Sequence, residues 1–409
     1  MNRPELLCPA GDFEKMRAAI HYGADAVYLG DSRFSLRNKA GNFGREELAA
    51  AVNYAHEHGV KAYVTVNVFA RNSDLSAIRE HMGLLRDIGP DAVIVSDPGI
   101  FAMFREKAPE IDIHVSTQAN ITNTESARFW ERMGAKRLIL SRELSIDEIR
   151  EIGGGVDIEL EAFVHGSVCL SYAGKCYLSS FMASRSANSG ECTNSCRWRY
   201  ALVEEKRPGQ YFPVFEDDRG AYVMNSKDLC LIEHLPLLYR AGVRSFKIEG
   251  RMKGIHYVAG VTRTYRQAVD RIEDATSYAA QLQTWKRELS LFGSRGYTTG
   301  LLFGDVRSDV CNFTGDDRTP EAEVAGVVVD ITGARAKVRL RAKLSVGDPI
   351  EYLTAYAEDR MITIESLRYE DGIEAVSAQA GETVVISATE HLRKGDLIRK
   401  ILQRQVHFQ

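Results

Sequence analysis

The chain of 409 residues is long enough to bury one large hydrophobic core and a second, smaller one. Its 44% hydrophobic and 26% charged residues are those of an ordinary soluble globular protein, and a formal charge of −4 argues against a globally basic nucleic-acid binder while leaving room for a local basic surface. The first residues lack the apolar stretch of a secretory signal, and no apolar run is long enough to span a membrane, so we expect a cytoplasmic protein without membrane contact. Disulfides are rare in that compartment, so we expect the seven cysteines to serve metal or redox chemistry.

A loose repeat begins near the N-terminus, in which a helical pattern ends at a glycine and a short apolar strand follows at once. Glycine just past a helix supplies a left-handed cap, and a β-branched run without alternation is typical of a strand buried on both faces. The pattern predicts strands at 5–8, 23–29, 59–64, 89–95, 112–117, 134–140, 157–164 and 242–248. It predicts helices at 13–22, 46–58, 75–87, 100–107, 124–133, 146–152, 229–240 and 257–272.

The alternation of these elements predicts an α/β fold, a (β/α)8 TIM-like barrel. A doubly wound open sheet would alternate in the same way, but the count of eight units favours closure. The spacing breaks once, because roughly eighty residues separate the seventh strand from the eighth, far more than a usual crossover needs. Within this insert, 211–216 and 221–224 flank Asp-Asp-Arg-Gly, which predicts a hairpin.

After residue 320 the pattern changes to short strands, expected at 324–330, 336–344, 348–353, 361–369 and 383–387. Turn signals such as Thr332-Gly333 and Asp371-Gly372 separate them, and helical periodicity ends. This predicts a small all-β domain, a compact barrel. The expected organisation is therefore a barrel domain at 1–315 that carries a cysteine-rich loop at 165–245, followed by a β domain at 320–402.

The strongest local feature is a group of cysteines in the insert, formed by Cys169, Cys176, Cys192 and Cys196, with Cys230 at the start of a predicted helix. Iron–sulfur clusters need four thiolates that converge from loops, with irregular spacing. The C-x6-C and C-x3-C spacings differ from the C-x2-C pairs of zinc ribbons, so zinc is the lesser alternative. Buried small hydrophobic residues that happen to lie close together are the remaining interpretation.

Charged and polar residues follow the predicted strands at the end where barrel enzymes carry their chemistry. His165 ends the seventh strand and could donate a proton or only bind the loop. Lys247 and Glu249 alternate onto one face of the eighth strand and Arg251 follows at the rim; buried charges there must be paired or functional. Further candidates close behind strands are Asn67, Asp97, Gln118, Arg142 and Glu143.

In the β domain, cations occupy every second position and apolar residues fill the gaps; the cations are Arg335, Lys337, Arg339, Arg341 and Lys343. A strand with this pattern has a cationic face opposite an apolar one. Such a row suits the phosphate backbone of RNA, and the alternative is a solvated edge strand protected by its charge.

Four segments together resemble the collagenase-like peptidase family, the unclassified peptidase family thirty-two. They are Glu-Leu-Leu-Cys-Pro-Ala-Gly at 5–11, the region 161–200 that opens with Glu-Ala-Phe-Val-His-Gly, Asn-Ser-Lys-Asp-Leu at 225–229 and Lys-Ile-Glu-Gly-Arg-Met-Lys at 247–253. Despite the family's name, the resemblance implies oxygen-independent hydroxylation with a four-iron four-sulfur (4Fe-4S) cluster, acting on transfer RNA, ribosomal RNA or ubiquinone precursors.

Two further segments, Arg-Pro-Gly-Gln-Tyr from 207 and Phe-Glu-Asp from 215, and the β domain make the chain most similar to the transfer-RNA branch of this family. That branch forms 5-hydroxyuridine at the wobble position and depends on prephenate, so tRNA and a small carboxylate are the implied partners. By the same resemblance Cys169, Cys176 and Cys192 match cluster ligands. The fourth is Cys230 by analogy with the quinone branch, which we expect, or Cys196 by analogy with that branch's partner protein.

A peptidase is the competing function. The sequence has no His-Glu-x-x-His zinc motif and no Gly-x-Ser-x-Gly elbow, although Cys169 and His165 are close enough in sequence for a thiolate–imidazole pair. A non-catalytic RNA-binding scaffold is the third alternative, which would keep the basic strand without needing a cluster.

Overall fold

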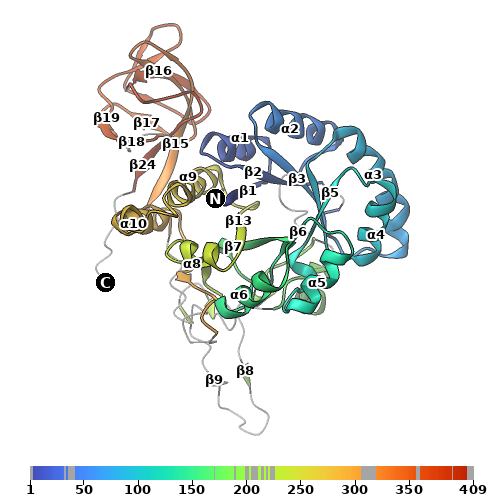
Figure 1. Cartoon of the computed structure of the whole chain (residues 1–409). Coiled ribbons are helices and arrows are strands. Elements are labelled where there is room, and N and C mark those ends of the chain that lie inside the picture. Colours follow the sequence, from blue (N-terminus) through green and yellow to red (C-terminus); the bar gives the residue numbers. More distant parts are fainter. Residues whose placement is uncertain are drawn as a thin grey trace.

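The computed structural model describes residues 3–31, 34–35, 42–169, 171–187, 190–198, 202–203, 211–212, 216–217, 220–221, 226–304, 319–355, 360–388 and 390–402. Two bodies are visible, a ring of strands and helices and a smaller β domain beside it (Figure 1).

Eight parallel strands form a closed barrel (Figure 1). They are β1 (Glu5–Ala10), β2 (Ala26–Gly30), β3 (Lys61–Val66), β4 (Ala92–Val95), β5 (Asp112–Val115), β6 (Arg137–Ile139), β7 (Glu159–Ser167) and β13 (Val243–Ile248). Each strand pairs with the next, and β13 pairs with both β7 and β1. The predicted closure is therefore confirmed, and the open sheet is excluded.

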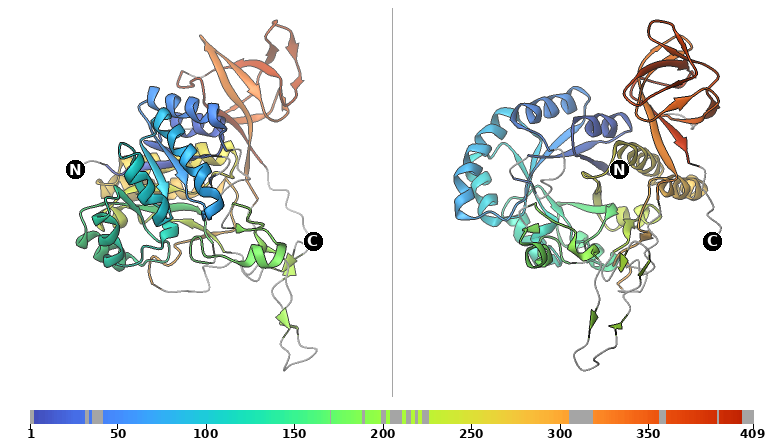
Figure 2. Two further views of the ribbon diagram at one scale, coloured as in Figure 1. Left: turned by 90° about the vertical axis from the view of Figure 1, so that its right-hand side faces the viewer. Right: turned by 180° about the vertical axis from the view of Figure 1, so that it is seen from behind.

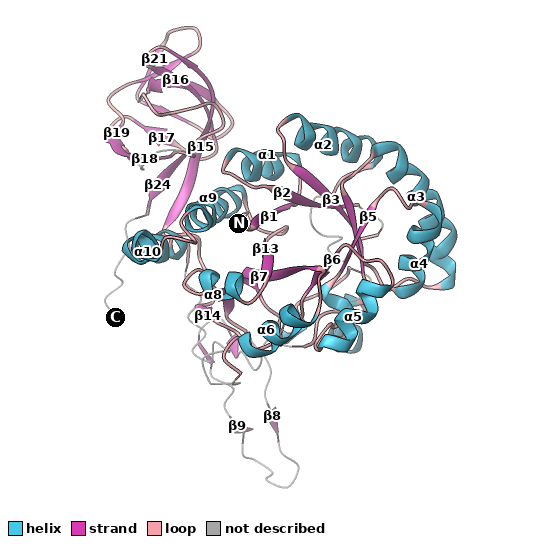
Figure 3. Ribbon diagram, in the orientation of Figure 1, coloured by secondary structure: helices cyan, strands magenta, loops and turns pink. Residues whose placement is uncertain are grey.

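Helices cover the outside of the barrel (Figure 3). They are α1 (Phe13–His21), α2 (Arg45–Glu57), α3 (Leu75–Ile88), α4 (Pro98–Lys107), α5 (Thr124–Arg132), α6 (Ile146–Gly155), α8 (Leu235–Arg240), α9 (Ile255–Asp270) and α10 (Ala275–Ser290). Side-chain caps explain several starts, since Asp12, Asp97, Asn123 and Ser145 each accept a bond from a backbone N–H of the first turn. Gly89 ends α3 in the left-handed conformation, with φ 69°. In the part of the chain that the structure describes, no helix combines the length and apolar character needed to cross a bilayer.

The helix predicted at 229–240 is wrong in its first half, because α8 begins only at Leu235. Pro236 stands in the first turn, where proline is tolerated, and it disfavours helical conformation in the residues before it. Residues Asp228–Cys230 instead form β12, which pairs antiparallel with the end of β7 and parallel with β14 (Tyr297–Thr298). This pairing satisfies backbone groups of β7 at Gly166 and Ser167, beyond its last register partner on β13.

The insert between β7 and β13 projects from the end of the barrel remote from the N-terminus (Figure 2). Its described elements are α7 (Leu178–Ala183), a 3₁₀ turn at Ser195–Arg197, β8 (Leu202–Val203), β9 (Tyr211–Phe212), β10 (Glu216–Asp217) and β11 (Gly220–Ala221). The predicted hairpin is present where β10 pairs with β11, but β9 pairs with β8 instead. Residues 207–210 and 215, which carried the closer family likeness, lie outside the described residues.

The C-terminal domain is an antiparallel sheet that curls into a half-barrel (Figure 1). Its strands are β15 (Ala322–Thr332), β16 (Arg335–Leu340), β17 (Leu344–Ser345), β18 (Pro349–Leu353), β19 (Arg360–Thr363), β20 (Leu367–Tyr369), β21 (Glu374–Ala375), β22 (Ser377–Ala378), β23 (Thr383–Ser387) and β24 (Leu397–Ile401). The predicted all-β character is therefore confirmed.

The half-barrel is docked on the barrel's outer helices. Tyr22, the residue that caps the C-terminus of α1, is buried between them; it donates to the Leu353 carbonyl at 2.6 Å and accepts from the Leu397 N–H at 2.8 Å. Arg399 of β24 reaches Glu288 of α10 with two bonds, at 2.6 and 2.8 Å. These buried contacts fix the β domain relative to the barrel.

Candidate functional site

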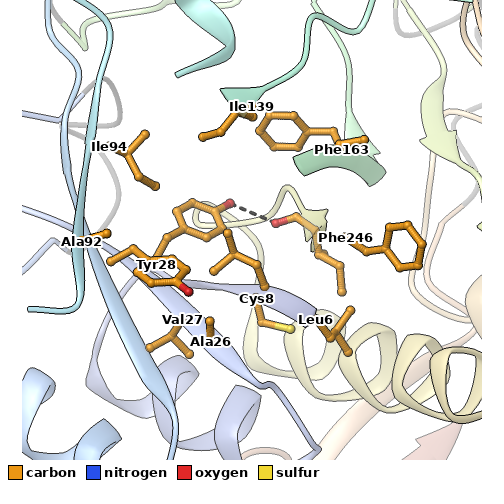
Figure 4. Close-up of a cluster of buried hydrophobic side chains, with 14 of the residues drawn as sticks. Leu6, Cys8, Ala26, Val27, Tyr28, Ala92, Ile94, Ile139, Phe163 and Phe246 are labelled. Carbon is orange, nitrogen blue, oxygen red and sulfur yellow. Dashed lines mark hydrogen bonds between the residues drawn. The ribbon is translucent and has the colours of Figure 1, made fainter. Parts of the chain in front are cut away.

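A cavity of about 170 Å³ opens at the carboxyl ends of the barrel strands, under the cysteine-rich insert. Its floor is made by inward-facing side chains of different strands, among them Tyr28, Ile94, Ile139 and Phe163. Figure 4 shows these four side chains lying around the same space inside the barrel. The mouth of a TIM-like barrel is where such enzymes carry their site, so this cavity is the candidate.

Lys247 is one of the charged residues that line the cavity. Its Nζ lies 2.8 Å from Oε1 of Glu161 and 4.7 Å from the centre of the Tyr28 ring, and the lysine is only 4% exposed. The expected need for a partner is therefore met, but by Glu161 of β7 and not by its neighbour Glu249. Glu249 is half-buried and lines the cavity as well.

A second buried cation lies beneath this pair. Arg137 of β6 contacts Oε1 of Glu5 at 2.5 Å, Oε2 of Glu161 at 3.1 Å and Oε2 of Glu159 at 2.8 Å. Burial alone would raise the pKa of Glu5, but the Arg137 guanidinium outweighs it and holds that pKa below its ordinary value. The cations Lys247 and Arg137 are thus compensated by Glu161, which is fully buried, and by Glu5, which is part-buried, as a dry interior requires.

Arg251 lies at the rim of the floor, as its position behind β13 predicts. It is buried, lines the cavity, and donates from Nη2 to Oγ of Ser35 at 2.5 Å. Gly30, the last residue of β2, makes room for it, because a Cβ there would collide with the guanidinium. Arg142 also lines the cavity, with its Nη1 donating to the Ser167 carbonyl at 3.0 Å.

Two amides add polar groups to the cavity wall. Nδ2 of Asn67 donates to Oε1 of Gln118 at 2.7 Å, and Ser116 Oγ donates to the same oxygen at 3.2 Å. Asn67 Oδ1 and Gln118 Nε2 are buried and have no hydrogen-bond partner within the described part of the chain. A ligand in the cavity could therefore meet one free acceptor and one free donor. The other two candidates do not line it: Asp97 caps α4, and Glu143 accepts from Ser141.

The five candidate cysteines fall into two groups. Cys169, Cys176, Cys192 and Cys196 all line the cavity, so the insert brings four thiols to one mouth. Cys230 on β12 does not line it, and its Sγ lies 3.8 Å from the Tyr265 hydroxyl. Among the described residues no three side chains of the metal-binding types are close enough to hold an ion. The donor set and its location suit a thiolate-bound cluster, for which the loop would draw the sulfurs together.

His165 is not at the mouth, which corrects the expectation from its position in β7. It is buried behind the strand, with Nδ1 3.2 Å from the Tyr265 hydroxyl and with the rings of Tyr257 and Tyr297 beside it. Alternation would put His165 on the same face as Phe163, but the ladder to β13 shifts register between these two residues. Burial lowers the pKa of His165 to about 3, so the imidazole is neutral.

The cationic row of the β domain alternates as expected, with Ala336, Val338 and Leu340 buried beneath it. The strand that carries the row, β16, is not an edge strand, because it pairs with β15 on one side and with β23 on the other. The strand also ends at Leu340, so the last two cations lie beyond it.

Two of the five cations of this row are paired with carboxylates. Lys337 Nζ lies 2.8 Å from Glu370 Oε1, and Arg341 contacts Glu14 of α1 in the barrel. Arg335, Arg339 and Lys343 are exposed. The surface that could meet phosphate is therefore narrower than the sequence pattern indicates.

Sequence reasoning missed Glu161, the partner of Lys247, and it missed the buried role of Arg137. A signal for Glu161 was present, because a carboxylate inside an apolar strand buried on both faces needs a cation. Nothing in the local sequence identifies which cation, since Lys247 is 86 positions away.

Comparison with known proteins gives two family matches and several relatives. The description of Peptidase family U32 matches residues 11–311, and that of the Peptidase family U32 C-terminal domain matches residues 320–399. The tRNA hydroxylation protein P of Escherichia coli strain K12 is 39% identical over 399 residues, 87% of each chain. The protein of that name from Haemophilus influenzae is 38% identical over 86% of each chain. The 23S rRNA 5-hydroxycytidine synthase of Escherichia coli is 35% identical over 86% of this chain and 53% of the relative.

Proposed function

This chain belongs to peptidase family U32, and from that membership and the cavity at the barrel mouth we propose that it is an enzyme that hydroxylates RNA without molecular oxygen. The substrate we propose is tRNA, and the product 5-hydroxyuridine at the wobble position. The observation that carries the proposal is the composite cavity, in which cysteines of the insert face a floor of buried cations and amides.

The cofactor in this proposal is a 4Fe-4S cluster, which would supply single-electron transfer beside the cavity. Cys169, Cys176 and Cys192 are three of its proposed ligands, since the family resemblance implies them and all three line the cavity. The family resemblance gives Cys230 as the fourth, whereas the shared cavity lining favours Cys196. Zinc is the alternative metal for the same thiols.

The small carboxylate that we propose as co-substrate, prephenate, would bind through the cations of the floor. Arg251 offers a planar fork that can hold a carboxylate with two bonds, and Lys247 offers a point charge. Asn67 and Gln118 would hold the edge of the base, because their free acceptor and donor complement the alternating donors and acceptors of a pyrimidine. The buried, low-dielectric floor strengthens each of these contacts.

A peptidase has little support from the geometry. A cysteine peptidase needs a thiolate beside an imidazole, but His165 faces Tyr265 behind the strand while Cys169 lines the cavity. Hydroxylation of 23S rRNA or of a quinone ring stays as the alternative, since one relative is named for ribosomal RNA.

The experiment is mass spectrometry of tRNA, rRNA and quinones from a strain that lacks the gene, complemented with wild type or with Lys247→Met. We expect 5-hydroxyuridine to be absent from the deletion strain's tRNA, restored by wild type and not by the variant. A tRNA that is unchanged, with 5-hydroxycytidine missing from rRNA or a hydroxyl missing from the quinone, would refute the proposed substrate. A Phe129→Ala chain, altered on the outer helix α5, is the matched control and should restore the nucleoside.

A further inference from the structure

Five large aromatic side chains stand exposed on the segments that also line the cavity, namely the loop after β3 and the insert with its helix α7. They are Phe69, Tyr172, Tyr177, Phe181 and Trp198, here called the aromatic rim. Phe181 is 78% exposed and Tyr177 is 72% exposed, so most of each ring faces solvent. Single exposed aromatic residues are ordinary, but a group of them at the entrance of a cavity indicates a binding surface.

The rim is continuous with the cavity. Along 171–178, residues that line the cavity alternate with exposed ones: Ala173, Cys176 and Leu178 line it, while Tyr172 and Tyr177 point outward. The same loop thus builds the inner wall with one set of side chains and the rim with the other. Phe69 follows the cavity-lining Asn67 at the end of β3 in the same way.

Polar contacts attach α7 to the loop that carries Cys192. Ser179 of α7 is buried, and its Oγ accepts from the Thr193 backbone N–H at 2.7 Å and lies 2.6 Å from the Thr193 hydroxyl. Two positions away on either side, Tyr177 and Phe181 face away from this anchor. Their exposure therefore follows from how α7 is attached to the loop that carries Cys192.

One cation lies against an aromatic side chain of the rim, and the sequence segment that carries the rim contains more cations than carboxylates. Lys175 Nζ is 5.4 Å from the centre of the Phe69 ring, and the insert segment 171–198 contains Lys175, Arg185 and Arg197 against the single carboxylate of Glu191. The chain as a whole has a charge of −4, so this segment departs from the rest. Aromatic faces interleaved with cations suit single-stranded nucleic acid, whose bases stack while its phosphates are neutralised.

We infer that the aromatic rim stacks the unpaired bases of an RNA loop on either side of the base that enters the cavity. This rests on the proposed function, because a base can reach the buried floor only after it has left its stack. Its neighbours then lose a stacking partner, and exposed rings at the entrance replace it. Paired RNA offers no free base faces, so the rim distinguishes loops from helices.

The test uses the full-length protein with two RNA probes, a hairpin with a loop of unpaired bases and a blunt duplex of the same stem. Replacing Tyr177 and Phe181 together by Ala should weaken hairpin binding by about 5- to 100-fold, measured by fluorescence anisotropy. The dependence of affinity on salt should not change, because no phosphate contact is removed. The exchange Tyr177→Phe with Phe181→Tyr should restore affinity, and Phe129→Ala, an equally aromatic exposed site on α5, should leave it unchanged.

Trp198 gives a second readout. Trp130 and Trp285 are buried, so Trp198 is the exposed member of the chain's three tryptophans. Its fluorescence should be quenched by the hairpin and not by the duplex.

Wild-type affinity in the Ala double variant would overturn the inference while leaving the proposed function intact. If that variant also lost turnover, the rim would dock a protein instead. If wild type bound neither RNA, the proposed function would fail and the rim with it.

Discussion

Lys247 can sit on the cavity floor because Glu161 neutralises it inside the barrel, and this dependence can be measured. Coulomb's law at an effective dielectric constant of about 20 gives roughly 6 kcal/mol of attraction for two charges 2.8 Å apart, most of which desolvation offsets. Removing the Glu161 carboxylate costs much more than this net value, because the Lys247 cation then stays buried without its partner. We expect Glu161→Gln, which keeps the side chain's size, to lower the free energy of unfolding by about 3–5 kcal/mol.

Lys247→Met should cost less, about 1–2 kcal/mol, because Glu161 keeps Arg137 as a partner at 3.1 Å. The double variant should then be more stable than the sum of the single effects predicts, by at least about 1 kcal/mol. The assay is chemical denaturation followed by far-ultraviolet circular dichroism. Glu110→Gln is the control, since Glu110 pairs with Arg86 at 2.6 Å on the surface and its loss should cost under about 1 kcal/mol. Single effects that add within about 0.5 kcal/mol would refute the coupling, and with it the account of the floor.

Four further outcomes are expected. Burial, with a nearby guanidinium, lowers the pKa of His256 to about 4, so below about pH 6.5 the unfolded chain takes up a proton that the folded chain does not. The free energy of unfolding should therefore fall from about pH 6.5 toward pH 4, by at most about 1.4 kcal/mol per pH unit, and His256→Phe should reduce this loss in denaturation series at several pH values. Arg251→Lys should weaken calorimetric binding of prephenate about tenfold with the fold intact, and equal affinity would remove Arg251 from the site. The family resemblance, against the cavity lining, makes Cys230 the expected fourth ligand, so in protein purified without oxygen Cys230→Ala should lose iron and sulfide while Cys196→Ala keeps them; the opposite result would make Cys196 the fourth ligand. Arg339→Ser should flatten the salt dependence of tRNA affinity, and an unchanged slope would exclude β16 from the RNA surface.

Much of the architecture follows from local signals. Glycine caps followed at once by apolar strands predict where the β/α units of the barrel lie. The pairing of β13 with β1 closes the barrel, as the count of eight units predicted. The helix expected from residue 229 was wrong because its periodicity was weighed without Pro236, whose restriction on the preceding residue is a local signal too.

The site was less accessible from the sequence, for reasons that are not local. The cysteine spacing identified the insert, and four of those thiols do line one cavity. The direction in which the His165 side chain points depends on a register shift in the pairing of β7 with β13, which no sequence pattern within β7 reveals. The edge-strand interpretation of the cationic row failed similarly, because the neighbours of β16 are set by strands distant in the chain.

The segments that carried the family resemblance also explain why the barrel interior is charged. Glu5 opens the first of them, Glu161 the second and Lys247 the last, and in the fold all three lie in one buried network around Arg137. A barrel interior filled by apolar side chains would be at least as stable, since a buried ion pair seldom stabilises a protein more than its well-packed apolar replacement does. We therefore expect the charges to serve the site and not stability, because the network ends at Lys247, which lines the cavity. A buried cation at that place is what the small carboxylate that we propose as co-substrate would need, because Lys247 offers it a point charge in a low-dielectric site.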